Sequence, residues 1–153
     1  MTRTPVIQLA ATVLCIGAAA SPARAHHSHA MFYDPCKSLT IEGRVDSVTW
    51  KQPHILFDVT LDDGTTYHAE WTSLEGVTRN NVRGSAQDAL AAGARVVVTG
   101  NPLRDPARIR ATYPNFKDDP DPKIVDVIQI RRTDDSWDWA RPDGGSPPKC
   151  SGK

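Results

Sequence analysis

Apolar residues occupy every second position in two neighbouring segments in the middle of the chain. Residues 55–61 place Ile, Phe, Val and Leu at alternate positions, and residues 65–72 repeat the pattern with Tyr, Ala and Trp. This period of two predicts strands that bury one face. The Asp-Asp-Gly sequence at residues 62–64 predicts a hairpin turn between them, because Gly tolerates the positive φ of tight turns.

Three further segments have strand character. Residues 39–50 are rich in Val, Thr and Ile, but their alternation changes phase near Asp46 and Ser47, which predicts a β-bulge. Residues 95–100 form the Val-rich run typical of a buried strand, and residues 124–132 predict the last strand.

The alternation is lost between residues 73 and 93, where helix signals replace it. Ser73 is a candidate N-cap for a short helix that runs to about Arg83 and ends at Gly84. Ser85 is a second capping signal, which precedes an Ala-rich turn. The proline-containing residues 101–122 are typical of a loop.

Three strands, a helical insert and two more strands predict an all-β fold, an OB-like five-stranded barrel over residues 39–132. A small β-sandwich is the alternative, but it needs about seven strands, and the pattern supports five. Residues 133–153 are expected to form an irregular C-terminal tail. Trp50 and Trp71 fall on apolar faces and are expected in the core, whereas Trp137 and Trp139 are expected to hold this tail against the barrel.

The first 25 residues have the pattern of a signal peptide. A short basic start precedes an apolar run over residues 6–20, and Ala23-Arg24-Ala25 offers small residues at a cleavage site. A lipoprotein alternative through Cys15 is disfavoured by the bulky Leu14 before it. We therefore expect a periplasmic or secreted protein that begins with a His-rich segment, residues 26–38, and has no membrane span after cleavage.

Charge and cysteine content narrow the possible partners and the compartment. The 18 basic and 18 acidic side chains leave a formal net charge of zero, so the chain lacks the basic character of nucleic-acid-binding proteins. Removal of the leader leaves Cys36 and Cys150, and an even pair in an exported chain predicts a disulfide bond. Two free thiols or an intermolecular bond are the competing interpretations.

Cleavage after Ala25 would make His26 the first residue of the mature chain. Its α-amine and imidazole could together chelate Cu(II), which favours nitrogen ligands of this kind. In a competing mode the amine, an amide nitrogen and the His27 ring bind the ion. His29 and His54 are candidates for a third ligand. The alternative is a solvated terminus that binds no metal.

Three residues inside the predicted barrel are also candidates. His68 and Glu70 share one strand face, either as an acid/base pair lining a groove or as the solvated side of a half-buried strand, which the alternation favours. His54 follows Pro53, whose ring restricts the backbone and gives His54 a defined position. His54 is either a metal ligand or a side chain whose ring forms a hydrogen bond with a loop carbonyl.

Several stretches resemble domain-of-unknown-function family 6152, a family of small exported bacterial proteins. The resemblance rests on the start at His26-His27-Ser28-His29, on residues 43–54 with their Trp-x-x-Pro-His ending, and on the Val-rich residues 93–100. It covers roughly residues 26–133 and implies an exported β-fold with a histidine pattern, but no activity. The cysteine pair and the Trp-bearing tail depart from the family pattern.

These observations predict an exported binding protein that holds Cu(II) at its N-terminal histidines. One alternative is a metal-free module that binds a periplasmic protein or a cell-wall ligand through the barrel face and the aromatic tail. Another is a copper-dependent oxidase or monooxygenase. An enzyme is the less favoured class, because the chain has no nucleophile elbow, phosphate-binding loop or dinucleotide motif.

Overall fold

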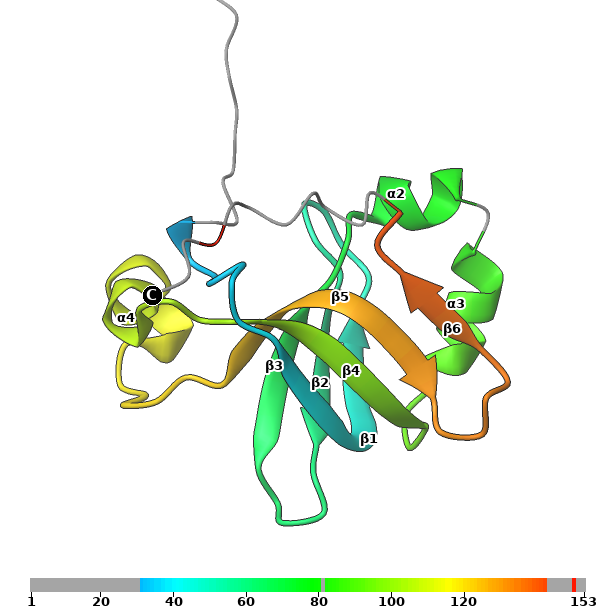
Figure 1. Cartoon of the computed structure of the whole chain (residues 1–153), viewed down its shortest axis with the longest axis horizontal. Coiled ribbons are helices and arrows are strands. Elements are labelled where there is room, and N and C mark those ends of the chain that lie inside the picture. Colours follow the sequence, from blue (N-terminus) through cyan, green and yellow to red (C-terminus); the bar gives the residue numbers. More distant parts are fainter. Residues whose placement is uncertain (1–30, 81, 143–149, 151–153) are drawn as a thin grey trace, which may run out of the picture.

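The strands of this computed structural model, which describes residues 31–80, 82–142 and 150, form one sheet whose first five members close into a barrel (Figure 1). The sheet order is β3-β2-β1-β4-β5-β6, and a parallel pairing of β3 with β5 closes the barrel. The strands are β1 (Leu39–Thr49), β2 (Leu56–Thr60), β3 (Thr66–Glu70), β4 (Arg95–Pro102), β5 (Ile124–Arg132) and β6 (Asp138–Ala140). The OB-like five-stranded barrel is confirmed.

Short helices cover two sides of the barrel. They are α2 (Leu74–Arg79), α3 (Arg83–Ala89), α4 (Pro106–Thr112) and the 3-10 helix η2 (Pro114–Phe116). Figure 1 shows α2 and α3 on one side of the barrel and α4 on the opposite side. Among the residues that the structure describes, no helix is both long and apolar enough to cross a membrane.

The first strand bends because of the bulge that its sequence predicts. The register of β1 against β2 shifts between Val45 and Ser47, and the same strand pairs with β4 along its first half. Close strand contacts at the bends require glycine. A Cβ added to Gly43 would lie 2.4 Å from the carbonyl oxygen of Thr60, and one added to Gly100 would lie 2.3 Å from that of Asp126.

We expect Gly100→Ala to lower the free energy of unfolding by about 1–3 kcal/mol, because the new methyl group overpacks a strand contact. Gly84→Ala is the matched control. Gly84 lies in α3 with no atom within 4 Å of an added Cβ, so its substitution should be neutral or should stabilise the helix by up to about 1 kcal/mol. Denaturant unfolding of both variants measures the difference, and equal stabilities would contradict the prediction.

The inward residues of the strands form the main core, as the alternation predicts. Phe57, Val59 and Ala69 are almost fully buried, and Trp71 is 1% exposed. Trp50 is partly buried and packs edge-on against Trp71. The outward residues of β2 and β3 remain available to line a surface site.

The helix boundaries differ from the sequence-based expectation. Ser73 caps α2 as predicted, with its hydroxyl accepting from the amide of Gly76. The second helix begins at Arg83 rather than after Ser85, so Gly84 lies inside it instead of ending the first helix. The expected loop before β5 contains α4 and η2. Asp105 caps α4 and Pro106 occupies its first turn, a standard start signal.

The expected irregular tail contains a strand, because β6 pairs with the edge of β5. Residues 143–149 and 151–153 of this tail lie outside the described residues. The roles predicted for its tryptophans are confirmed. The rings of Trp137 and Trp139 pack edge-on against Trp71, and Trp139 is only 6% exposed. These contacts attach the aromatic residues of the tail to the barrel.

The predicted bond between Cys36 and Cys150 is confirmed, with their Cα atoms 5.6 Å apart. Cys36 belongs to an N-terminal segment that runs along the end of β4. Its backbone contacts include the amide of Asp34 donating to the carbonyl of Pro102 and the amide of Arg104 donating to the carbonyl of Phe32. The disulfide therefore joins Cys150 to a segment that backbone hydrogen bonds already hold against the barrel.

Candidate functional site

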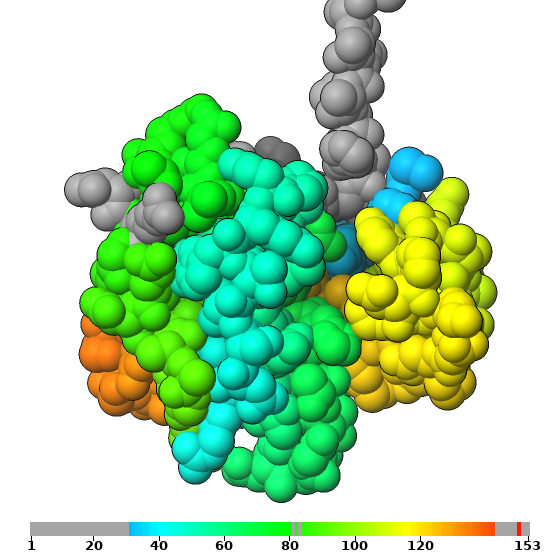
Figure 2. Space-filling model, turned by 180° about the vertical axis from the view of Figure 1, so that it is seen from behind, coloured from blue at the N-terminus to red at the C-terminus, as the bar shows by residue number. Residues whose placement is uncertain are grey.

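A cavity of about 670 Å³ lies against the outward face of β2 and β3. Its walls come from the end of β1 and the loop that follows, from β2 and β3, and from the α4–η2 segment. In Figure 2 the yellow α4–η2 segment stands beside the cyan and green strands that form the floor. The ionisable side chains of the lining, apart from tyrosines, are Lys51, His54, Asp58, His68, Glu70 and Asp119.

Strand periodicity explains why three of these groups meet. Asp58 lies on the outward face of β2, and His68 and Glu70 lie on the outward face of β3. Asp58 is directly opposite His68, whereas Glu70 is opposite Leu56. Side chains at such cross-strand positions are close neighbours.

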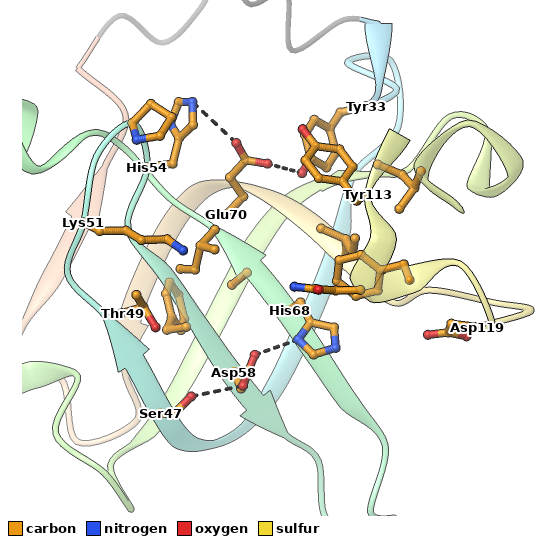
Figure 3. A pocket seen from close by; sticks show the side chains of 18 of the residues that line it. Tyr33, Ser47, Thr49, Lys51, His54, Asp58, His68, Glu70, Tyr113 and Asp119 are labelled. Carbon is orange, nitrogen blue, oxygen red and sulfur yellow. Dashed lines mark hydrogen bonds and ion pairs between the residues drawn. The ribbon is translucent and has the colours of Figure 1, made fainter. Parts of the chain in front are cut away.

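Glu70 is held from two directions. The hydroxyl of Tyr33 donates to Glu70 Oε2, and Nε2 of His54 lies 3.5 Å from Glu70 Oε1. Figure 3 shows the carboxylate between the two rings. Two oxygens contacted from opposite sides leave little rotational freedom, so this carboxylate is preorganised on the cavity wall.

Burial raises the pKa of Tyr33 above its ordinary range, and the charge of Glu70 and the hydrogen bond to it add to this effect. Tyr33 therefore remains a hydrogen-bond donor at neutral pH. Burial also raises the pKa of Tyr113, the residue that follows α4, with a smaller contribution from Glu70.

We expect the free energy of unfolding to fall as the pH rises above about 10, because the folded chain keeps the Tyr33 proton that the unfolded chain loses. Tyr33→Phe should remove much of this alkaline decline. Denaturant unfolding between about pH 8 and about pH 11 measures the slope. Tyr113→Phe, at a ring that is 43% exposed, is the control and should change the slope less. An unchanged slope in Tyr33→Phe would contradict the assignment.

The second fixed group is the pair of Asp58 and His68. Nδ1 of His68 lies 2.7 Å from Asp58 Oδ1, and the hydroxyl of Ser47 donates to Asp58 Oδ2 at 3.0 Å. A carboxylate can only accept, so Nδ1 carries the proton, and Nε2 of a neutral ring is left as an acceptor. The ring also packs edge-on against Phe116 of η2.

A small second core holds the α4–η2 wall in place. Tyr33, Ile109 of α4 and Ile124 of β5 form its buried centre. Arg110 donates to the carbonyl of Pro120 and secures the segment before β5. The N-terminal segment and α4 are thus packed together, which brings Tyr33 to the cavity.

The structure places His54, His68 and Glu70 around one cavity. Of the two side chains predicted to share an outward strand face, each has its own partners, because His68 contacts Asp58 while Glu70 contacts Tyr33 and His54. The directly opposed partners of two adjacent strands are Asp58 and His68, so an acid/base pair forms across the strands rather than along one of them.

Sequence reasoning missed Asp58, Tyr33 and Lys51 as lining residues. The same period of two that selected His68 could have found Asp58. No local pattern connects Tyr33 with Glu70, which lies 37 positions later. Lys51 directly follows the strand region that predicted the bulge, but its orientation depends on the loop.

The predicted copper ligands His26, His27 and His29 lie outside the described residues. Within residues 31–80, 82–142 and 150, no group of three or more His, Cys, Asp or Glu side chains is placed to hold a metal ion. His54 is described and contacts Glu70.

The fold and the cavity define the chain as a small OB-like barrel with an open pocket on its β2–β3 face. The model of a family of unknown function, DUF6152, matches residues 13–111, and the chain belongs to this family. No curated protein matches the sequence.

Proposed function

We propose that this chain is an exported binding protein that takes a small molecule into the barrel-face cavity. The observation that carries the proposal is the cavity itself, about 670 Å³ in volume and lined by two preorganised histidine–carboxylate groups. Its volume falls within the range of small-molecule sites, about 300–1,000 Å³. OB-like barrels use this strand face and the flanking loops to bind ligands.

A blocking variant tests the proposal. Leu56 lines the cavity and is 39% exposed, so Leu56→Trp should obstruct the cavity floor without disturbing the core. Thr40→Trp, at an exposed position of β1 outside the lining, is the matched control. In a thermal-shift screen of the full exported chain, ligands should stabilise the native chain and Thr40→Trp but not Leu56→Trp. Equal stabilisation of all three proteins would place binding elsewhere.

A second candidate function is Cu(II) binding at the mature N-terminus. Support comes from Tyr33 and His54, which contact the same Glu70 carboxylate. A chain spans at most about 3.3–3.6 Å per residue, so the four residues back from Tyr33 to His29 can reach about 14 Å. The N-terminal histidines therefore belong to a stretch attached close to His54.

Cu(II) titration of correctly processed protein tests this second function. The α-amine and the ring of His26 form the proposed chelate, and one extra N-terminal Ala would remove that free amine. The extra Ala should therefore weaken Cu(II) binding strongly. His54→Ala should weaken Cu(II) binding if the His54 ring is a ligand. Equal affinity with and without the extra Ala would exclude the terminal chelate. N-terminal sequencing of exported material tests the leader on which the idea depends.

Two other functions stay predictions from the sequence. Copper-dependent oxidation requires peroxide-dependent turnover by the copper-loaded chain. A metal-free module for a periplasmic protein or a cell-wall ligand would use the barrel face and the partly buried Trp137 of the tail.

A further inference from the structure

We propose that the ligand of the barrel-face cavity is an organic cation, a linear aliphatic diamine. This inference rests on the proposed binding function and names the ligand class of the same cavity. The argument uses the charge of the lining, its hydrogen-bonding character, the spacing of its carboxylates and the apolar surface between them.

The cavity lining is acidic or neutral in every protonation state of its two imidazoles. It contains the carboxylates of Asp58, Glu70 and Asp119 and the ammonium of Lys51. Three negative groups against one positive group leave a formal charge of −2 when His54 and His68 are neutral, and zero when both are protonated. Such a lining attracts cations and offers no excess positive charge to an anion.

The fixed polar groups are mainly acceptors. An ionised carboxylate has about four acceptor sites, and the contacts described above use two on Glu70 and two on Asp58. The side chains of Glu70 and Asp58 remain 21% and 35% exposed. A neutral His68 adds the acceptor Nε2. The matching ligand therefore presents several N–H donors and positive charge.

Two carboxylates are spaced for two ammonium groups. Asp58 is opposite His68, and Glu70 lies two residues beyond His68 on the same face. Asp58 and Glu70 are thus diagonal neighbours, whose Cα atoms are about 7–8 Å apart in antiparallel sheets. A ligand with an amine at each end of a short chain can contact both.

Apolar and aromatic side chains suit the stem of such a ligand. Leu56, 39% exposed, lies in the lining opposite Glu70 and two residues before Asp58 on the same strand face, and Ile124 adds apolar surface. Tyr113 and Phe116 form the facing wall, and aromatic faces attract ammonium groups. Methylene groups would pack on the floor while the amines contact the carboxylates.

Lys51 provides a test of the sign of the ligand's charge. Figure 3 shows its side chain extending toward the cavity, and it makes no ion pair or hydrogen bond among the described residues. A cationic ligand is repelled by Lys51, whereas an anion or a zwitterion would use it. Lys51→Ala should therefore strengthen diamine binding by up to about fivefold, the effect of a partly exposed charge.

Calorimetric titration of the full exported chain with α,ω-diamines of increasing chain length tests the proposal. Diols and dicarboxylates of the same lengths are the matched ligands. We expect diamines to bind with an optimum at an intermediate length, and diols and dicarboxylates not to bind. Glu70→Gln and Asp58→Asn should each weaken diamine binding by about tenfold or more, which corresponds to about 1.4 kcal/mol.

Asp88→Asn is the charge-matched control, because Asp88 is an exposed residue of α3 outside the cavity. It should leave the affinity unchanged. Asp58→Asn provides a second carboxylate variant in case Glu70→Gln perturbs the fold through its contacts with Tyr33 and His54.

Three outcomes would overturn the diamine assignment: equal binding of the diols, binding of the dicarboxylates, or weaker diamine binding in Lys51→Ala. Absence of diamine binding would overturn it as well. If other compounds still stabilise the native chain but not Leu56→Trp, the cavity remains a ligand site and the ligand class alone is wrong. If no compound does, both proposals fail.

Discussion

Removal of the Cys36–Cys150 disulfide is expected to lower the free energy of unfolding by about 2–5 kcal/mol. The bond joins positions 114 residues apart, so its loss releases a long loop in the unfolded chain. Folding must then restrict more conformations, which destabilises the native state. Denaturant unfolding of the Cys36→Ser/Cys150→Ser double variant measures the loss.

Reduction of the native protein provides the control for this prediction. It should reproduce the loss of stability in the native chain and leave the double variant unchanged. Because Cys36 lies three positions after Tyr33, hydrogen exchange should also increase in residues 31–36, the segment that carries the lining residue Tyr33. A loss of stability below about 1 kcal/mol would show that the native contacts already hold this segment.

Trp71→Ala is expected to lower the free energy of unfolding by about 3–5 kcal/mol. Trp71 is 1% exposed and contacts three other indole rings, with centroid distances of 6.4 Å to Trp50, 6.4 Å to Trp137 and 5.1 Å to Trp139. Its truncation leaves a large cavity beneath β6. We therefore also expect faster hydrogen exchange in β6 than in β1.

Trp71→Phe is the matched control for the aromatic cluster. The indole Nε1 of Trp71 is buried and has no hydrogen-bond partner among the described residues, so phenylalanine removes a polar group that is costly to bury. It also keeps a ring against Trp139. Trp71→Phe should therefore cost clearly less than Trp71→Ala, and equal losses would contradict the contribution of ring packing.

Local sequence patterns predicted the strands well. The final strand was expected over residues 124–132 and is observed as Ile124–Arg132, because a strand's alternation reflects which of its faces is buried. The bulge after Val45 was visible for the same reason. Helix α4 was missed although Asp105 and Pro106 carry a local start signal, since the surrounding prolines favoured a loop.

β6 had no comparable local signal. Its three residues are too few to establish a period, and the strand exists because the edge of β5 offers hydrogen bonds and Trp71 offers an aromatic surface for Trp139. The expected irregular tail was wrong at these positions because long-range contacts determine their structure.

The candidate site also contains residues that the sequence could select and contacts that only the fold determines. His54, His68 and Glu70 could be selected from position and periodicity, and the disulfide followed from cysteine parity in a chain expected to be exported. Their partners depend on the closed barrel. Tyr33 reaches Glu70 across 37 positions because the N-terminal segment packs on α4.

The amino-acid order alone thus determines the five barrel strands, the faces that they bury and the outward positions that can carry chemistry, since these properties depend on neighbours along the chain. Barrel closure and the docking of the N-terminal and α4–η2 segments create the cavity and assign each carboxylate its partner. Those features arise from contacts between residues far apart in sequence, which a one-dimensional pattern does not record.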